Sequence, residues 1–250
     1  VKVAGHDVVK YALDTYGDEV GALSCTHDAN AWPSDLYAGL PAPAEGERVT
    51  LWIQNSHPTK IPADSIGLNR MGSQEVGWLK KEVAPFGSFA LDVSTVLPEL
   101  AWPDQIEIRA GKHMVRPRYE VETRVNRRIA HVNVERTDLA PDKGLAELGN
   151  LVGKGHILPA PLLPTKRYET TVLPTPMSTK QLELGIKLLV FDANGQEICA
   201  RRLGRLSRDH SVALSMNELL EDCGVGSAGV LGHIELTYDF SDGVEADGWL

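Results

Sequence analysis

The stretch Ser88-Phe89-Ala90-Leu91-Asp92-Val93 alternates apolar and polar side chains, and residues 211–216 repeat this pattern 123 positions later. A period of two predicts a β-strand with one buried face. The same period marks residues 49–54, 182–191 and 234–240. Because this alternation dominates the chain, we expect an all-β fold of antiparallel strands.

Further pairs of similar stretches occur in the same order along the chain. The Leu-Pro-rich segments 40–43 and 173–176 precede the strands expected at 49–54 and 182–191. Residues 105–108 likewise resemble residues 233–236, and the offsets between copies vary only from 123 to 133 residues. Recurrence in one order with nearly one offset predicts two copies of a single β-domain.

We therefore predict two tandem antiparallel β-sandwiches, each of immunoglobulin-like or fibronectin type III-like size. The first covers residues 40–137 and the second residues 171–250, which we expect to be truncated because nothing in it matches 111–136. Residues 138–170 are rich in Pro and Gly and predict a surface connector, because proline does not fit a central strand. A single large jelly-roll sandwich is the alternative.

The N-terminal segment 1–39 predicts one short helix followed by a polar loop. Asp7 can cap the helix and Gly17 can end it. The apolar residues between them recur at helical spacing: Val8, Val9, Ala12, Leu13 and Tyr16.

Composition excludes several classes of protein. The 250 residues are 42% hydrophobic, which speaks against a disordered or coiled-coil chain. The net charge of −9 argues against a nucleic-acid partner, and no apolar run is long enough to span a membrane. The three cysteines, Cys25, Cys199 and Cys223, are too few and odd in number for a disulfide framework. With no signal peptide visible, this slightly favours the cytoplasm, although the localisation stays open.

No sequence motif points to catalysis. The chain has no His-Glu-x-x-His, Cys-x-x-Cys, Walker A or Gly-x-Ser-x-Gly pattern, and the glycines of 224–229 do not follow a strand as a dinucleotide site requires. His27, Asp28 and His57 have suitable donor atoms for a metal, but their spacing does not require one. We predict no catalytic residue, no metal and no cofactor.

The basic segment 112–136 holds seven Lys and Arg residues against three Glu residues. Its alternation predicts a β-hairpin with residues 124–127 as the connection, so that Tyr119 lies opposite Val132 on the buried face. The outer face would then pair Arg116 with Glu135, Arg118 with Asn133 and Glu120 with His131.

Trp52 adds an indole to the polar face of its own strand. The outer hairpin face supports two interpretations, which are cross-strand salt pairing and ligand recognition. If the face recognises a ligand, the candidate binding residues are Arg116, Arg118, Glu120, His131, Asn133, Glu135 and Trp52.

The leading functional hypothesis is a non-catalytic binding or spacer module of a longer protein. Its partner would be an anionic ligand, a glycan or a protein, and its oligomeric state is open. One alternative is an enzyme, metal-dependent or not, with a site between the two sandwiches. Its candidate residues are His27, Asp28, His57, His113 and His131. The other alternative is a purely structural or assembly domain.

Overall fold

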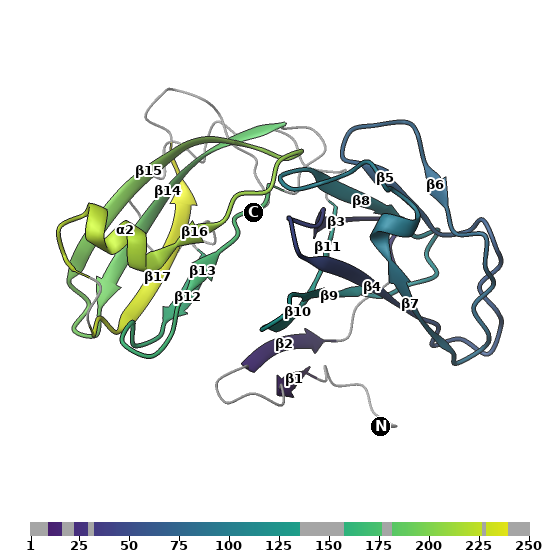
Figure 1. The fold of residues 1–250 in the computed structure, drawn as a ribbon, viewed down its shortest axis with the longest axis horizontal. Helices are drawn as coiled ribbons and strands as arrows, with labels where there is room; N and C mark the ends of the chain where they lie inside the picture. Colours follow the sequence, from purple (N-terminus) through teal and green to yellow (C-terminus); the bar gives the residue numbers. More distant parts are fainter. Residues whose placement is uncertain are drawn as a thin grey trace. The chain divides into compact units, whose positions relative to one another are not determined.

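The computed structural model describes residues 10–16, 23–29, 33–135, 158–176, 182–226 and 229–239. The chain divides into two compact units, Val1–Glu135 and Arg136–Leu250. In the described ranges every element is a strand except helix α2 (Met216–Asp222) and the 3-10 turn η1 (Val93–Thr95), as Figure 1 shows. All strand pairs in these ranges are antiparallel, so the predicted all-β antiparallel class is confirmed. None of the helical residues described here forms a segment long and apolar enough to cross a bilayer.

Nine strands build the two larger sheets of the first unit. They are β3 (Leu36–Pro41), β4 (Arg48–Gln54), β5 (Gly67–Arg70), β6 (Gly77–Trp78), β7 (Ser88–Asp92), β8 (Gln105–Arg109), β9 (Arg118–Glu122), β10 (Arg127–His131) and β11 (Asn133–Val134). One sheet has the order β10-β9-β4-β7, and the other has the order β11-β3-β8-β5-β6.

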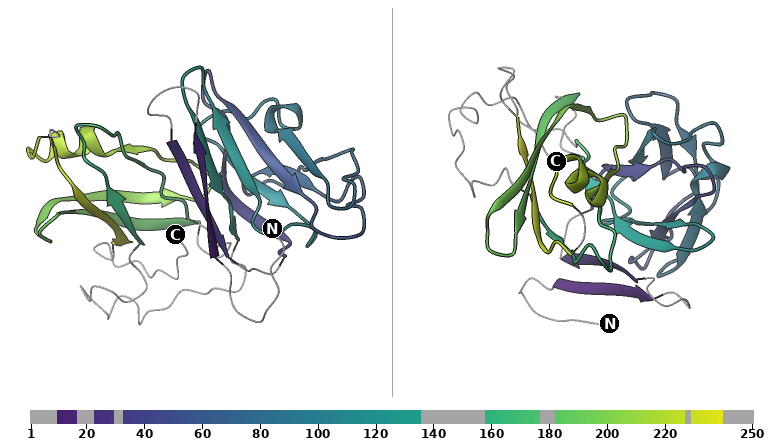
Figure 2. Two further views of the ribbon diagram at one scale, coloured as in Figure 1. Left: turned by 90° about the horizontal axis from the view of Figure 1, so that it is seen from below. Right: turned by 60° about the vertical axis from the view of Figure 1, so that its left-hand side comes forward.

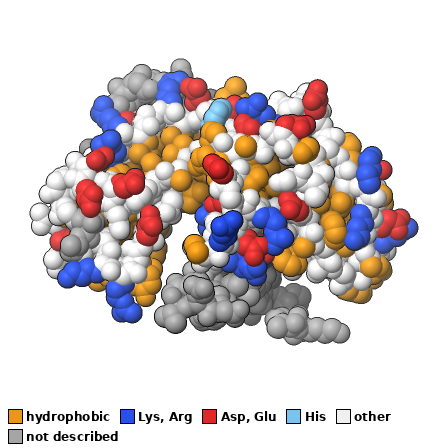
Figure 3. Space-filling view, viewed as in Figure 1, with side chains coloured by type: hydrophobic (Ala, Val, Ile, Leu, Met, Phe, Trp, Pro, Cys, Tyr) orange, Lys and Arg blue, Asp and Glu red, His pale blue; other side chains and the backbone are white. Residues whose placement is uncertain are grey.

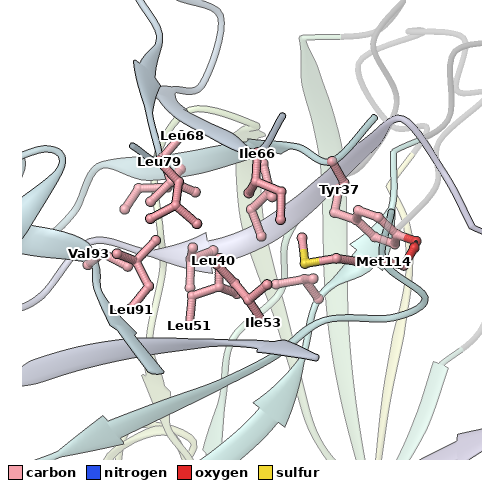
Figure 4. Packing of buried hydrophobic residues seen from close by; sticks show 14 of the residues in the cluster. Tyr37, Leu40, Leu51, Ile53, Ile66, Leu68, Leu79, Leu91, Val93 and Met114 are labelled. Carbon is pink, nitrogen blue, oxygen red and sulfur yellow. The ribbon is translucent and has the colours of Figure 1, made fainter. Parts of the chain in front are cut away.

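The inner faces of these two sheets share one apolar core. Leu51 and Ile53 of β4 and Leu91 of β7 pack in the same cluster as Leu40 of β3 and Ile106 of β8. Figure 4 shows Leu40, Leu51 and Ile53 pointing toward one another. Each fully buried Leu or Ile stabilises the fold by about 1.5–3 kcal/mol. The first unit is therefore a two-layered β-sandwich in which alternate residues of β4 point away from the core.

The N-terminal helix prediction is wrong. Residues Lys10–Tyr16 form strand β1, which pairs antiparallel with β2 (Leu23–Ala29) over seven residue pairs, from Lys10↔Ala29 to Tyr16↔Leu23 (Figure 2). The helical spacing covers fewer than three turns, and isolated helices of that length are marginal in water. Pairing with a second segment of the chain therefore decides the conformation. A local sequence pattern cannot predict this pairing.

The second unit is built around a four-stranded sheet with the order β12-β17-β14-β15 and a separate short ladder, β13-β16. The strands are β12 (Leu158–Leu162), β13 (Thr171–Val172), β14 (Glu183–Asp192), β15 (Glu197–Ser207), β16 (Leu214–Ser215) and β17 (Gly232–Tyr238). Leu188 and Ile234 of the large sheet pack in one cluster with Met216 and Leu220 of α2. The helix therefore covers the inner face of this sheet.

Part of the expected connector 138–170 is a strand. In β12, Ala160 pairs with Ile234, while Pro159 and Pro161 lie on either side. An edge strand turns every second N–H away from its neighbour, so prolines at alternate positions remove no ladder hydrogen bond. The rule that excludes proline from central strands holds, but it does not exclude an edge strand. The rest of the connector up to residue 157 lies outside the described residues.

The sequence also predicts a hairpin turn at Asn194-Gly195 and a bend near Gly204, and the hairpin of β14 and β15 contains both. The Asn-Gly signal lies in the connection, where Gly195 has a φ of +80°. The bend expected near Gly204 is a β-bulge, because Ile186 pairs with Gly204 but Lys187 pairs with Arg202. Gly204 itself has a φ of +73°, which suits glycine.

The strand expected over 211–216 is much shorter than its alternation suggests. Only Leu214 and Ser215 are extended, and the Ser215 hydroxyl then accepts a hydrogen bond from the Glu218 N–H as the N-cap of α2. In the first unit, Asp92 caps η1 in the same way through the Ser94 N–H. A capping side chain at the end of each strand therefore stops the extended pattern.

A disulfide joins Cys199 of β15 to Cys223, which follows α2. The odd number of cysteines concealed this pair, because the third cysteine, Cys25, lies in the first unit. Disulfides persist mainly in oxidising compartments. The cysteines therefore give no support to a reducing compartment.

Candidate recognition surface

The outward side chains of the sheet β10-β9-β4-β7 form one continuous surface. Trp52 pairs with Arg118, Thr50 pairs with Glu120, and Arg118 also pairs with His131. Directly opposite residues in antiparallel strands share a face. The alternate residues of β4 are in the core, so this face points away from it. We call it the Trp52 face, and its members are Arg48, Thr50, Trp52, Gln54, Ser88, Ala90, Asp92, Arg118, Glu120, Glu122, Arg127, Ile129 and His131.

Four of the seven predicted binding residues meet on the Trp52 face, although the predicted register is wrong by two residues. Ala130, rather than Val132, lies opposite Tyr119. The connection consists of residues 123–126 instead of 124–127, because the Thr123 hydroxyl accepts hydrogen bonds from the N–H groups of Val125 (3.3 Å) and Asn126 (2.9 Å). A slip of two residues keeps every side chain on its expected face.

The other three predicted residues do not belong to this face. After β10 the chain changes sheets, and Asn133 pairs with Ala38 of β3 in the opposite layer. Glu135, which follows β11, is 3% exposed. Arg116 lies in the bend before β9, where it has a φ of +43°. A hairpin rule assumes that both strands stay in one sheet, and here the second strand does not.

Arg118 lies on the Trp52 face but does not offer its charge to solvent. Its exposed fraction is 6%. Its guanidinium donates to the Arg116 carbonyl oxygen at 3.3 Å, and Trp52 and His131 flank it on the neighbouring strands. Arg118 therefore presents little of its side chain on this surface.

Two glutamates organise the exposed part of the face. The Trp52 indole N–H donates to Glu120 Oε2 at 3.2 Å, and Arg127 Nε contacts Glu120 Oε1 at 2.7 Å. Glu122 forms ion pairs with both Arg127 and Arg48. Figure 3 shows positive and negative side chains next to each other over β9 and β10. Opposite charges are therefore matched across the strands.

The ion pairs change the acidity of Glu122. The hydrogen bond from Arg127 holds the pKa of this carboxyl below its ordinary value of 4.5, and Arg48 adds to the effect. Glu122 is therefore ionised at any pH near neutrality. On the opposite, core-facing side of β9, burial raises the pKa of Tyr119 above 10.0.

Beside Trp52 the face is open on the β7 side. Trp52 is half-buried, and its partner on β7 is the small, exposed Ala90. The next pair along the strands is Gln54 with Ser88, and both residues are exposed. On the β7 side, the residues of the face next to Trp52 are thus the exposed Ala90 and Ser88 and the half-buried Asp92.

The N-terminal hairpin covers the free edge of β10. The Ser24 hydroxyl accepts from the Ile129 N–H at 2.7 Å and donates to the Ile129 carbonyl at 3.2 Å. Thr26 Oγ1 lies 3.2 Å from His131 Nδ1. These contacts use side chains of β2 to satisfy an edge strand, which otherwise presents unpaired backbone groups.

The metal and enzyme candidates stay a prediction, because the side chains of His27 and Asp28 lie outside the described part of the structure. His27 and Asp28 lie in β2, and His57 lies on an exposed loop after β4. Among the residues that the structure describes, no group of three His, Cys, Asp or Glu side chains could hold a metal ion. Each unit is described by itself, so the expected site between them is not tested.

Arg48, Glu122 and Arg127 also belong to the face, although they were not among the predicted binding residues. Arg127 was expected in the connection, and it becomes the first residue of β10 once the turn moves back by one residue. The threonine at the start of Thr123-Arg124-Val125-Asn126 is the signal that could have placed the turn.

Comparison with known proteins gives little further information. No protein-family model matches the chain, and no curated protein matches it. Among solved structures, the chain is similar to the crystal structure of chicken CNTN1 FN1-FN3 domains, with 13% sequence identity and a TM-score of 0.20. The alignment covers 88% of this chain and 64% of that chain. The architecture described above rests on the strand pairings alone.

Proposed function

We propose that the chain is a non-catalytic β-sandwich binding module and that the Trp52 face is its recognition surface. The observation that carries this proposal is the Trp52–Glu120–Arg127 constellation on the outer face of a sheet. Sheet backbones hold side chains rigidly, and a rigid site loses less conformational entropy on binding. An aromatic ring with polar neighbours is also a common core of interaction surfaces.

The charges on the face favour an uncharged or mixed-charge partner over an anion. Both exposed arginines of the face, Arg48 and Arg127, are already paired with glutamates. An anionic ligand would have to displace these carboxylates. A glycan or a protein surface therefore suits the face better than a simple phosphate or sulfate does.

We also propose that the two units are copies of one domain. Four pairings in the first unit, β3–β8, β4–β7, β5–β6 and β5–β8, correspond in order to β12–β17, β13–β16, β14–β15 and β14–β17 in the second. The capped turn after β7 corresponds to the capped helix after β16. In this correspondence β4 (residues 48–54) matches β13. The sequence similarity between residues 49–54 and 182–191 is therefore not part of the proposed repeat. A tandem arrangement of this kind supports a module that binds and spaces.

The test is backbone-amide NMR of the whole chain during titration with a panel of ligands. The panel consists of neutral oligosaccharides, sulfated oligosaccharides, inorganic phosphate and divalent metal ions. We expect at least one titration to shift signals of β4, β7 and β9 together, and Trp52→Ala to abolish those shifts. Shifts confined to other regions, or a response to metal ions alone, would contradict the proposal and favour the enzyme alternative.

A further inference from the structure

We propose that the Trp52 face takes an uncharged oligosaccharide with one pyranose ring stacked on the indole of Trp52. This inference rests on the proposed function and specifies its ligand. The best ligands are sugars whose substituents are all equatorial, since such rings present a flat patch of C–H groups. A flat C–H patch matches a flat aromatic surface, which combines apolar contact with a polar edge.

The indole is fixed in place by its hydrogen bond to Glu120. The 3.2 Å contact from Nε1 uses the polar edge of the ring, and Arg127 Nε holds the same carboxylate from the other side at 2.7 Å. A ring held in this way does not have to be ordered when a ligand binds. Because the face toward β7 is bordered by the exposed Ala90 and Ser88, a sugar ring has room beside the indole.

The charge balance selects an uncharged ligand. Arg48 and Arg127 face Glu120 and Glu122, so these four groups carry equal numbers of positive and negative charges, and Asp92 adds one more negative charge to the face. Sugar hydroxyls both donate and accept hydrogen bonds. They can therefore donate to the remaining lone pairs of the carboxylates and accept from guanidinium N–H groups without breaking the ion pairs. A sulfate or carboxylate on the ligand would gain attraction from the arginines but meet equal repulsion from the glutamates.

The spacing of the strands allows more than one sugar to bind. Neighbouring strands lie about 4.8 Å apart, so Trp52 on β4 and Glu120 on β9 occupy adjacent rows of the face. One ring can stack on the indole while the next contacts Glu120 and Arg127. We therefore expect affinity to increase from one sugar to two and then to level off.

The experiment is isothermal titration calorimetry of the whole chain with cellohexaose, xylohexaose and a heparin-derived hexasaccharide, supported by NMR of the Trp52 indole N–H. We expect a neutral hexasaccharide to bind and to shift that signal. Trp52→Ala should weaken this binding at least tenfold, whereas Trp52→Phe should retain most of it. Trp78→Ala is the matched control, because Trp78 is 39% exposed on β6 of the opposite sheet. It should leave binding unchanged.

Each of the remaining outcomes would contradict a specific part of the proposal. Binding of the heparin-derived ligand alone, lost in Trp52→Ala, would overturn the uncharged ligand and keep the recognition surface. Binding of a neutral sugar that persists in Trp52→Ala, with the indole signal unmoved, would overturn both. No response to any of the three sugars would overturn this inference, while the panel described above still tests the surface itself.

Discussion

Arg127 is the residue on which the electrostatics of the Trp52 face depend, because it contacts both Glu120 and Glu122. Its hydrogen bond is the largest cause of the low pKa of Glu122. A lowered carboxyl pKa stabilises the fold above the ordinary value of 4.5, and this contribution is lost as the pH falls through the lowered pKa. The ionised side chain of Glu122 should therefore contribute to stability near neutral pH, and this contribution should disappear in acid.

We predict that Arg127→Ala raises the pKa of Glu122 toward its ordinary value of 4.5 without restoring it fully, because Arg48 remains. The measurement is a carboxyl-carbon NMR titration of Glu122 between pH 2 and 6, a range that brackets ordinary Glu pKa values of about 4.3. Arg124→Ala in the adjoining connection is the control and should leave the titration in place. Equal titration curves for the two variants would show that the ion pair does not exist in solution.

The sequence predicted on which side of the sheet a side chain lies more reliably than which residue lies opposite it on the neighbouring strand. Trp52, Arg118, Glu120 and His131 share the expected side, because sidedness depends only on odd or even position along a strand. Their cross-strand partners depend on where the turn begins, and a single hydroxyl at Thr123 decides that. The burial of Arg118 follows from neighbours on two other strands and has no local signal.

At the scale of elements, Gly204 is the residue that the β14–β15 hairpin needs. It has a φ of +73° at the bulge, and a Cβ there would meet no atom within 4 Å. We predict that Gly204→Ala destabilises the second unit by about 1 kcal/mol through backbone strain alone. Urea unfolding should show this loss, and Gly204→Asn should lose less because Asn tolerates the left-handed region. An unchanged midpoint for the alanine variant would mean that the bulge is not at this residue.

Strong turn and bulge signals could be predicted from the sequence, whereas weak periodic signals could not. Asn194-Gly195 marks a turn because only a few residues adopt its backbone conformation. Apolar spacing over 8–16 suits a short helix as well as a strand, and only the pairing of β1 with β2 decides between them. The prolines of β12 occur at alternate positions, a spacing that is compatible with an edge strand. The overall proline content of the segment does not reveal this spacing.

For the whole molecule, alternation was enough to predict an all-β chain, because it follows from burying one face of each sheet. The pairing of β4 with β9, and the transfer of the chain from β10 to β11, required long-range contacts that no window of sequence contains. The disulfide was missed for a related reason. Cys199 and Cys223 are 24 residues apart, and only the fold brings β15 and the end of α2 together.

The disulfide gives a test of whether the two units are separate cooperative bodies. It closes a loop within the second unit alone, since both cysteines lie in Arg136–Leu250. A loop of 24 residues restricts the unfolded chain by about 3 kcal/mol. We predict that Cys199→Ala combined with Cys223→Ala lowers the stability of the second unit by about this amount and leaves the first unit unchanged. Hydrogen-exchange mass spectrometry should show faster exchange in β14 and β17 but not in β4 and β8, and Cys25→Ala should change neither set. Equal acceleration in both sets would show that the two units unfold as one, because a constraint confined to one cooperative unit cannot destabilise an independent neighbour.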